Sequence, residues 1–374
     1  MKEPMILEEL EQFILEAKAG GKKIIAFMAH EFIPIELIHA SGMIPLKIMM
    51  NGNDELFAMG KEYMTSSCCS WANSVLGMFE SAKSDHKYRI FELTDYYICS
   101  NYCNADLFAS EIIANKFEKP ILRFFVPFKN TAIHVDGFYH ELQRFKVELE
   151  RISGKPIEKE KIWESIKKYN ELRFKLLQIT SSSLPAKEKL QHIWKAATFG
   201  PFYTDLPKDM LFDFSEQNTK PKIVFSGCQP FIDDDIVDLI EECGLEISFF
   251  DTWDGSYFSS ALVDSELESD GIDPLKVLAE TFKKNKGSPH LIENSEIHLE
   301  QRLLNHVFDT QSSGVIYYIL KFCEVYGNRR DRIKNLLKEK GIPFLALERD
   351  FSSSSGQLRT RIEAFKEVIT DAKK

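Results

Sequence analysis

GVIYYILKF (314–322) decides the fold class of this chain. Its residues are almost all apolar, without the alternation of polar and apolar side chains that marks a strand with one face in water. A short continuous apolar run of this kind is typical of a strand buried on both faces, as strands in parallel sheets are. The stretch therefore predicts a buried strand of a parallel sheet.

Strand and helix patterns alternate on both sides of this stretch. The expected strands are KIVFSG (222–227), EISFFDT (246–252) and PFLALERDF (343–351), and the expected helices cover 232–243, 272–286, 293–309, 327–340 and 356–369. Parallel strands need crossover connections, which helices usually supply. Residues 222–374 therefore predict a doubly wound, flavodoxin-like α/β domain.

The first 131 residues show the same alternation and predict a second doubly wound, flavodoxin-like α/β domain (1–131). The expected strands are KKIIAFMA (22–29), IPLKIMM (44–50), YYIC (96–99) and PILRFFVPF (120–128), and the expected helices cover 4–19, 34–42, 70–82 and 104–117. Residues 132–199 carry helical periodicity and many charges, so they predict a helical insert. Residues 200–221 hold three prolines and polar clusters, which indicate the connection into the next domain.

Length, charge and the distribution of apolar residues indicate which partners and which compartment to expect. A length of 374 residues agrees with two domains of similar size. The formal net charge is −10 and no basic stripe stands out, so nucleic acid is not expected as a partner. No apolar run reaches the roughly 18 residues of a transmembrane helix. Since the N-terminal stretch also lacks the features of a signal peptide, we expect a cytoplasmic protein without a membrane partner.

Six of the seven cysteines stand at expected strand ends or helix starts. In open parallel sheets ligands bind beyond the carboxyl ends of the strands, so these are positions where sites are built. The six are Cys68 and Cys69 before helix 70–82, Cys99 and Cys103 around the end of YYIC, Cys228 after KIVFSG, and Cys323 after GVIYYILKF. Cys243 instead continues an apolar series at helical spacing and is expected in the core.

The residues alone leave three explanations of these six cysteines open. Free cysteines are often buried as small apolar residues. Structural zinc sites usually show C-x-x-C or paired Cys/His spacings, whereas the spacings here are C-C and C-x-x-x-C. Iron–sulfur ligation by thiolates from distant loops fits the pattern better. A disulfide framework is not expected, because the number is odd and the compartment reducing.

Five stretches spread over the chain form a specific set. They are IPIELIHASGMIPLKI (33–48), CSWANSVLG (69–77), NYCNADLF (101–108), GVIYYILKFCE (314–324) and IPFLALERDFSSSSGQLRTRIEAF (342–365). Together they resemble the 2-hydroxyacyl-CoA dehydratase D-component family, which also holds benzoyl-CoA reductase subunits and double-cubane cluster proteins. The likeness covers nearly the whole chain.

The resemblance implies a site and a chemistry. Cys69, Cys103 and Cys323 match the three ligands of a [4Fe-4S] cluster in this family, which leaves one iron free for a substrate oxygen or another ligand. An ATP-hydrolysing iron–sulfur activator protein would supply a low-potential electron, and an acyl-CoA substrate would react as a radical. The partner subunit would be a homologous chain, in a homodimer or a heterodimer. The sequence itself contains no G-x-x-x-x-G-K-[ST] loop, so if ATP drives the chemistry a partner hydrolyses it, and no G-x-G-x-x-G after a strand, so a nicotinamide or flavin dinucleotide is not indicated.

Three further cysteines keep a second function open. Cys68, Cys99 and Cys228 are additional to the cysteines of the dehydratase pattern. Double-cubane proteins resemble this chain in having a cysteine after the strand that corresponds to KIVFSG (222–227). Two bridged cubanes, an [8Fe-9S] cluster, need six thiolates, and six are present outside the expected core. The alternative is therefore a double-cubane protein that catalyses ATP-dependent, low-potential reduction of small molecules.

Two pairs of polar or flexible residues complete the predicted site. His30 and Glu31 follow the first expected strand, where a histidine beside a cluster could move a proton. Helix capping and surface charge explain the same two residues equally simply. Ser355 and Gly356 open the last expected helix, where backbone N–H groups could hold a CoA phosphate, although Ser is also a common N-cap residue.

Overall fold

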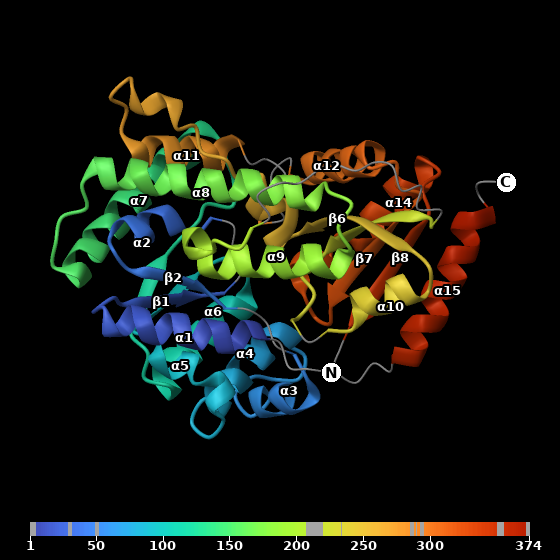
Figure 1. Cartoon of the computed structure of the whole chain (residues 1–374), viewed down its shortest axis with the longest axis horizontal. Helices are drawn as coiled ribbons and strands as arrows, with labels where there is room; N and C mark the ends of the chain where they lie inside the picture. The colour runs from blue at the N-terminus through green and yellow to red at the C-terminus, as the bar shows by residue number, and fades with distance from the viewer. Residues whose placement is uncertain are drawn as a thin grey trace.

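The computed structural model describes residues 5–28, 32–48, 52–206, 220–232, 234–284, 288, 290–291, 295–349 and 355–371. It contains two four-stranded sheets in which all the paired strands are parallel. Figure 1 shows the two sheets side by side, each with helices packed around it. The predicted fold class, two flavodoxin-like α/β domains, is confirmed.

The two sheets share one strand order. The N-terminal sheet runs β2-β1-β3-β4 and the C-terminal sheet β6-β5-β7-β8. The strands are β1 (Ile24–Phe27), β2 (Ile44–Lys47), β3 (Tyr96–Ser100), β4 (Ile121–Phe124), β5 (Lys222–Gly227), β6 (Glu246–Thr252), β7 (Gly314–Leu320) and β8 (Phe344–Arg349). In each sheet the order reverses beside the first strand, and the crevice at such a switch point is where ligands bind in doubly wound folds. The loops after β3 and β7 therefore occupy the favoured positions for a site.

Strand β7 has the burial that its sequence predicts, because all seven of its residues are buried. It lies between β5 and β8, with helices on both faces of the sheet. The helices of this half are α10 (Ile236–Glu242), α12 (Ser295–Asp309), α13 (Glu324–Gly327), α14 (Arg330–Glu339) and α15 (Ser355–Asp371). The helix expected over 327–340 is observed as α14, which begins three residues later, and the short helix α13 before it was not expected.

The N-terminal sheet is covered by α1 (Met5–Ala19), α2 (Ile35–Ala40), α3 (Asp54–Gly60), α4 (Ser70–Ser81), α5 (Ile90–Leu93) and α6 (Asn104–Lys116). Two glycines bring α3 and α4 into backbone contact. A Cβ atom added to Gly77 would lie 2.0 Å from the carbonyl oxygen of Leu56, and one added to Gly60 would lie 1.8 Å from that of Asn73. Because only glycine permits this approach, the pair sets how closely α3 packs on α4.

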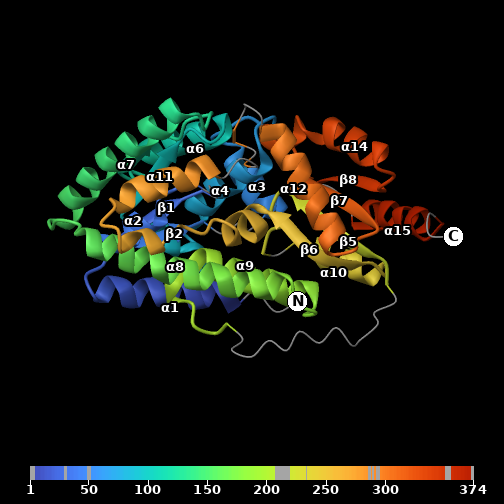
Figure 2. The ribbon, with the colours of Figure 1, turned by 90° about the horizontal axis from the view of Figure 1, so that it is seen from above.

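The helical insert consists of α7 (Ala132–Ser153), α8 (Lys159–Thr180) and α9 (Ala186–Phe199). Helix α9 contacts both β2 and β6, so it joins the two sheets. Helix α11 (Pro274–Lys284) follows β6 in the chain but packs against α7, on the side of the N-terminal sheet, as Figure 2 shows. One apolar cluster runs through both halves of the molecule and a second lies between the N-terminal sheet, α7, α8 and α11.

Candidate metal centre

Three cysteines occupy equivalent positions, each at the N-cap of a helix. Cys69 precedes α4, Cys103 precedes α6 and Cys323 precedes α13. The Cys103 sulfur accepts a hydrogen bond from the backbone N–H of Asp106 at 3.4 Å. Cys69 and Cys323 make no such cap hydrogen bond with their side chains. Helix N-termini favour negative charge, which in part opposes the effect of burial on these thiols.

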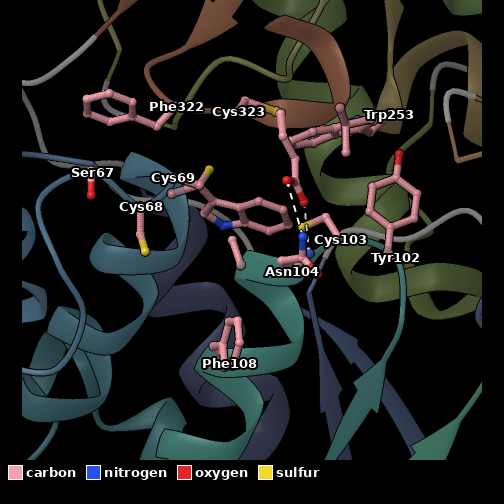
Figure 3. Close-up of a pocket in the computed structure, with 14 residues that line it drawn as sticks. Ser67, Cys68, Cys69, Tyr102, Cys103, Asn104, Phe108, Trp253, Phe322 and Cys323 are labelled. Carbon is pink, nitrogen blue, oxygen red and sulfur yellow. Dashed lines mark hydrogen bonds between the residues drawn. The ribbon is translucent and has the colours of Figure 1, made fainter. Parts of the chain in front are cut away.

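The same three cysteines line one pocket between the two halves of the molecule. Its cavity volume is about 180 Å³, and Cys68 lines it as well. Figure 3 shows the thiols with the aromatic side chains around them. The other lining residues are Ser67, Trp71, Tyr102, Asn104, Ala105, Phe108, Trp253, Phe322, Glu324 and Val325. The N-terminal sheet contributes the wall with Cys103, and the C-terminal sheet contributes the wall with Cys323.

The thiols influence one another's ionisation, because they are close and poorly hydrated. The pKa of Cys69 lies well above its usual range, first because of a hydrogen bond with Cys323 and then because of burial. Burial, followed by the charge of Asp106, raises the pKa of Cys103. For Cys323 a hydrogen bond with Cys228 is the largest cause of its raised pKa. Three thiolates here therefore need a cation, and metal binding is the ordinary way of supplying one.

The pocket fits an iron–sulfur cluster in its donor set. Thiolates are the protein ligands of cubane clusters. Two indole Nε1–H groups, of Trp71 and Trp253, are buried at the pocket without a hydrogen-bond acceptor among the described residues. The sulfides and thiolates of a cluster would accept such bonds, which are one of the factors that set cluster potentials.

The spacing of the ligands also bears on the kind of metal. Within the described ranges, no three His, Cys, Asp or Glu side chains lie close enough together to hold a single metal ion. Ligand sulfurs around a cubane stand farther apart, roughly 6–7 Å, since a whole cluster lies between them. Cys69 and Cys323 lie closer than this, within reach of a hydrogen bond, so their sulfurs would have to move apart to ligate a cubane.

The other cysteines lie around this pocket in three different ways. Cys68 is part-exposed and lines the pocket beside Cys69. Cys228 is fully buried and lies behind Cys323, where its sulfur accepts from the backbone N–H of Leu320 at 3.4 Å. Cys99 is buried inside β3, and burial raises the pKa of its thiol. Neither Cys228 nor Cys99 is among the residues that line the pocket.

The structure describes the remaining predicted site residues only in part. His30 and Glu31 lie outside the described residues, so their predicted role in proton transfer stays a prediction. Gly356 is exposed in the first turn of α15, which begins at Ser355, but the side chain of Ser355 and the residues just before it lie outside the described part. The predicted phosphate site therefore also stays a prediction. Cys243 is buried at the end of α10 and belongs to the apolar core, as its spacing predicts.

Sequence reasoning missed two contributors to the pocket, Trp253 and Glu324. Trp253 directly follows β6, at the same edge of the C-terminal sheet as Cys323, and its ring packs on Trp71 with centroids 5.0 Å apart. Glu324 follows Cys323 and contacts Asn104 from the other half of the molecule. The sequence signal that could have identified Glu324 is its position directly after Cys323.

Two buried ion pairs join segments that are far apart in the sequence. Lys47 at the end of β2 contacts Asp254, which follows β6, and both side chains are almost completely buried. Arg173 of α8 contacts Glu36 of α2 at 2.6 Å between Nη1 and Oε1. The Lys47–Asp254 pair joins the two halves of the molecule, and the Glu36–Arg173 pair joins α2 to the helical insert.

Comparison with known proteins gives one consistent result. The sequence profile of the family described as "2-hydroxyglutaryl-CoA dehydratase, D-component" matches residues 31–369. The chain is 25% identical to the beta subunit of (R)-2-hydroxyglutaryl-CoA dehydratase from Acidaminococcus fermentans, over 94% of each chain. It is 24% identical to a benzoyl-CoA reductase subunit from Thauera aromatica, over 91% of this chain and 88% of that one. It is 22% identical to the (R)-phenyllactyl-CoA dehydratase beta subunit from Clostridium sporogenes, over 97% and 96%.

Among the described residues, no helix combines the length and the apolar character needed to cross a bilayer.

Proposed function

The chain belongs to the 2-hydroxyglutaryl-CoA dehydratase D-component family, and from this membership we propose that it is the iron–sulfur subunit of a 2-hydroxyacyl-CoA dehydratase or of a benzoyl-CoA-reductase-type enzyme. One observation carries the proposal: three cysteines at helix N-caps line a single pocket between the two halves of the molecule. Relatives named as subunits of such enzymes match nearly the whole chain, which supports the same function.

Cys69, Cys103 and Cys323 would hold a [4Fe-4S] cluster, and such a cluster supplies single electrons at low potential when bound. The chain's own residues prepare the pocket for it. Each thiol stands at a helix N-terminus, where negative charge is favoured, and aromatic side chains line the pocket around the thiols. Among the described residues that line the pocket, Glu324 alone carries a charged side chain, and the carboxyl of Asp106 lies close enough to raise the pKa of Cys103 after burial does. An apolar, weakly charged pocket favours the more oxidised form of a negatively charged cluster and therefore lowers its potential.

The partners follow from the same family. We propose a homologous subunit, because several relatives are named as beta subunits. An ATP-hydrolysing iron–sulfur activator protein would deliver the electron, since the sequence contains no P-loop of its own. An acyl-CoA would be the substrate, with its phosphates at the helix start around Ser355 and Gly356.

Anaerobic purification with iron and sulfide counting, followed by EPR of the reduced protein, tests the proposal. We expect about four irons per chain and the signal of a single reduced cubane. Cys228→Ser should leave both unchanged, because Cys228 lies behind Cys323 and does not line the pocket. About eight irons per chain, with loss of about half of them in Cys228→Ser, would instead establish the double-cubane alternative. A chain without iron and sulfide would refute both.

Trp71→Phe should lower the reduction potential of the cluster without changing the iron content. The buried indole Nε1–H lacks an acceptor among the described residues, and a hydrogen bond to cluster sulfur stabilises the reduced, more negative state. Phenylalanine keeps the aromatic packing on Trp253 but removes the donor. The measurement is a redox titration followed by EPR. Trp163→Phe, at a buried tryptophan of α8 outside the pocket, is the control and should leave the potential unchanged. A Trp71→Phe potential equal to or above that of the wild type would contradict the hydrogen bond.

A further inference from the structure

The segment Lys321–Glu324 runs from the end of β7 to the first residue of α13 and contains Cys323. It lies where the two halves of the molecule meet. At one end, the carbonyl oxygen of Lys321 accepts a hydrogen bond from the backbone N–H of Ser70 at 3.2 Å. At the other end, Oε1 of Glu324 accepts from the backbone N–H of Asn104 at 2.9 Å, and Oε2 accepts from the Asn104 side chain at 3.4 Å. Figure 3 marks the bonds from Asn104 with dashed lines.

The two donors have the same structural role. Ser70 is the first residue of α4 and Asn104 the first residue of α6, so each directly follows a cysteine that caps its helix. The first N–H groups of a helix have no partner inside the helix and need one from elsewhere. Here the segment Lys321–Glu324 supplies both partners from the other half of the molecule. Each end of the segment is thus tied beside one of the other two cysteines.

The middle of the segment is strained in a way that fits this role. Phe322 has φ of 62°, the left-handed region that bulky residues rarely adopt, and its side chain is exposed. A residue remains in such a conformation when its surroundings hold it there, and strain of this kind gathers at functional sites. The turn at Phe322 brings Cys323 back toward the pocket between the two tied ends.

We propose that Lys321–Glu324 is a clamp that sets the position of Cys323 relative to Cys69 and Cys103, and that Glu324 is its positioning residue. The inference rests on the proposed function, since the spacing of three cysteines matters most when they share one cluster. Of the two ties, the one through Glu324 is made by a side chain and can be removed by substitution. Its carboxylate also caps α6 from the opposite half, where negative charge is favoured.

The first test uses the protein without its cluster. Glu324→Ala should speed hydrogen exchange of the Asn104 amide about fivefold, the typical effect of losing one helix cap. Glu324→Gln should restore most of the protection, because the side-chain oxygen can still accept from the Asn104 N–H. Glu339→Ala, at an exposed acid at the end of α14, is the control and should leave the exchange unchanged. Unchanged exchange at Asn104 in Glu324→Ala would overturn the clamp.

The second test measures how fast a chelator removes iron from the anaerobic protein. Glu324→Ala should release iron about fivefold faster than the wild type, and Glu324→Gln at nearly the wild-type rate. Equal acceleration by both variants would overturn the positioning role, since only the charge would then matter. If the wild-type chain binds no iron, the proposed function fails while the exchange experiment still judges the clamp. If iron is bound and Glu324→Ala changes neither rate, the clamp alone fails.

Discussion

Cys103→Ala should reduce the iron content from about four per chain to nearly none. Cys103 is the thiol that the loop after β3 contributes to the pocket, at the N-terminus of α6. Without it, Cys69 and Cys323 would remain as two ligands where three are needed. The measurement is iron and sulfide per chain after anaerobic reconstitution, with circular dichroism to verify the fold.

Cys99→Ala is the matched control for this result. Cys99 lies four residues earlier in the same strand–helix unit, is buried, and does not line the pocket. Under the single-cubane proposal its removal should leave the iron content unchanged, and so should Cys243→Ala in the core. Retention of iron by Cys103→Ala would contradict the ligand set, and loss of iron by Cys99→Ala would indicate a second cluster.

Glu36→Ala should lower the free energy of unfolding by about 3–5 kcal/mol, the usual cost of breaking a buried ion pair. The side chains of Glu36 and Arg173 are 4% and 5% exposed, and Arg173 Nε has no hydrogen-bond partner among the described residues. Removing the carboxylate leaves a buried guanidinium without its counter-charge. The measurement is urea unfolding of the cluster-free protein under reducing conditions.

Two variants separate this effect from ordinary packing changes. Replacing both partners, in Glu36→Ala with Arg173→Leu, should recover part of the loss, because no unpaired charge then remains buried. Glu171→Ala breaks an exposed pair with Lys175 on the same helix as Arg173 and should cost about 0.5 kcal/mol or less. A loss below about 1 kcal/mol for Glu36→Ala would show that the pair does not stabilise the packing of α2 on α8.

Local patterns predicted most of the elements. The apolar run of β7 identified a buried strand correctly, because its residues are buried whatever the neighbouring strands are. The helices expected over 70–82 and 104–117 are observed as α4 and α6, within one residue at each end. Helix α3 was not anticipated, since it is short and lies on α4 through contacts with glycines that no periodicity reveals. The position of α11 against α7 was equally invisible, because it depends on contacts between distant segments.

The sequence by itself determined that cysteines stand at strand ends and helix starts, and that the two sheets are parallel. Both follow from patterns within about twenty residues of chain, such as apolar runs and helical spacing. Only the tertiary structure decided which thiols share a pocket. Cys103 lines it while Cys99 is enclosed between β3 and α6, and Cys323 lines it while Cys228 lies behind. The reason is that the packing of the two domains sets the distance between their loops. Contacts such as the hydrogen bond from the Asn104 N–H to Glu324, which are 220 residues apart in the sequence, determine that packing.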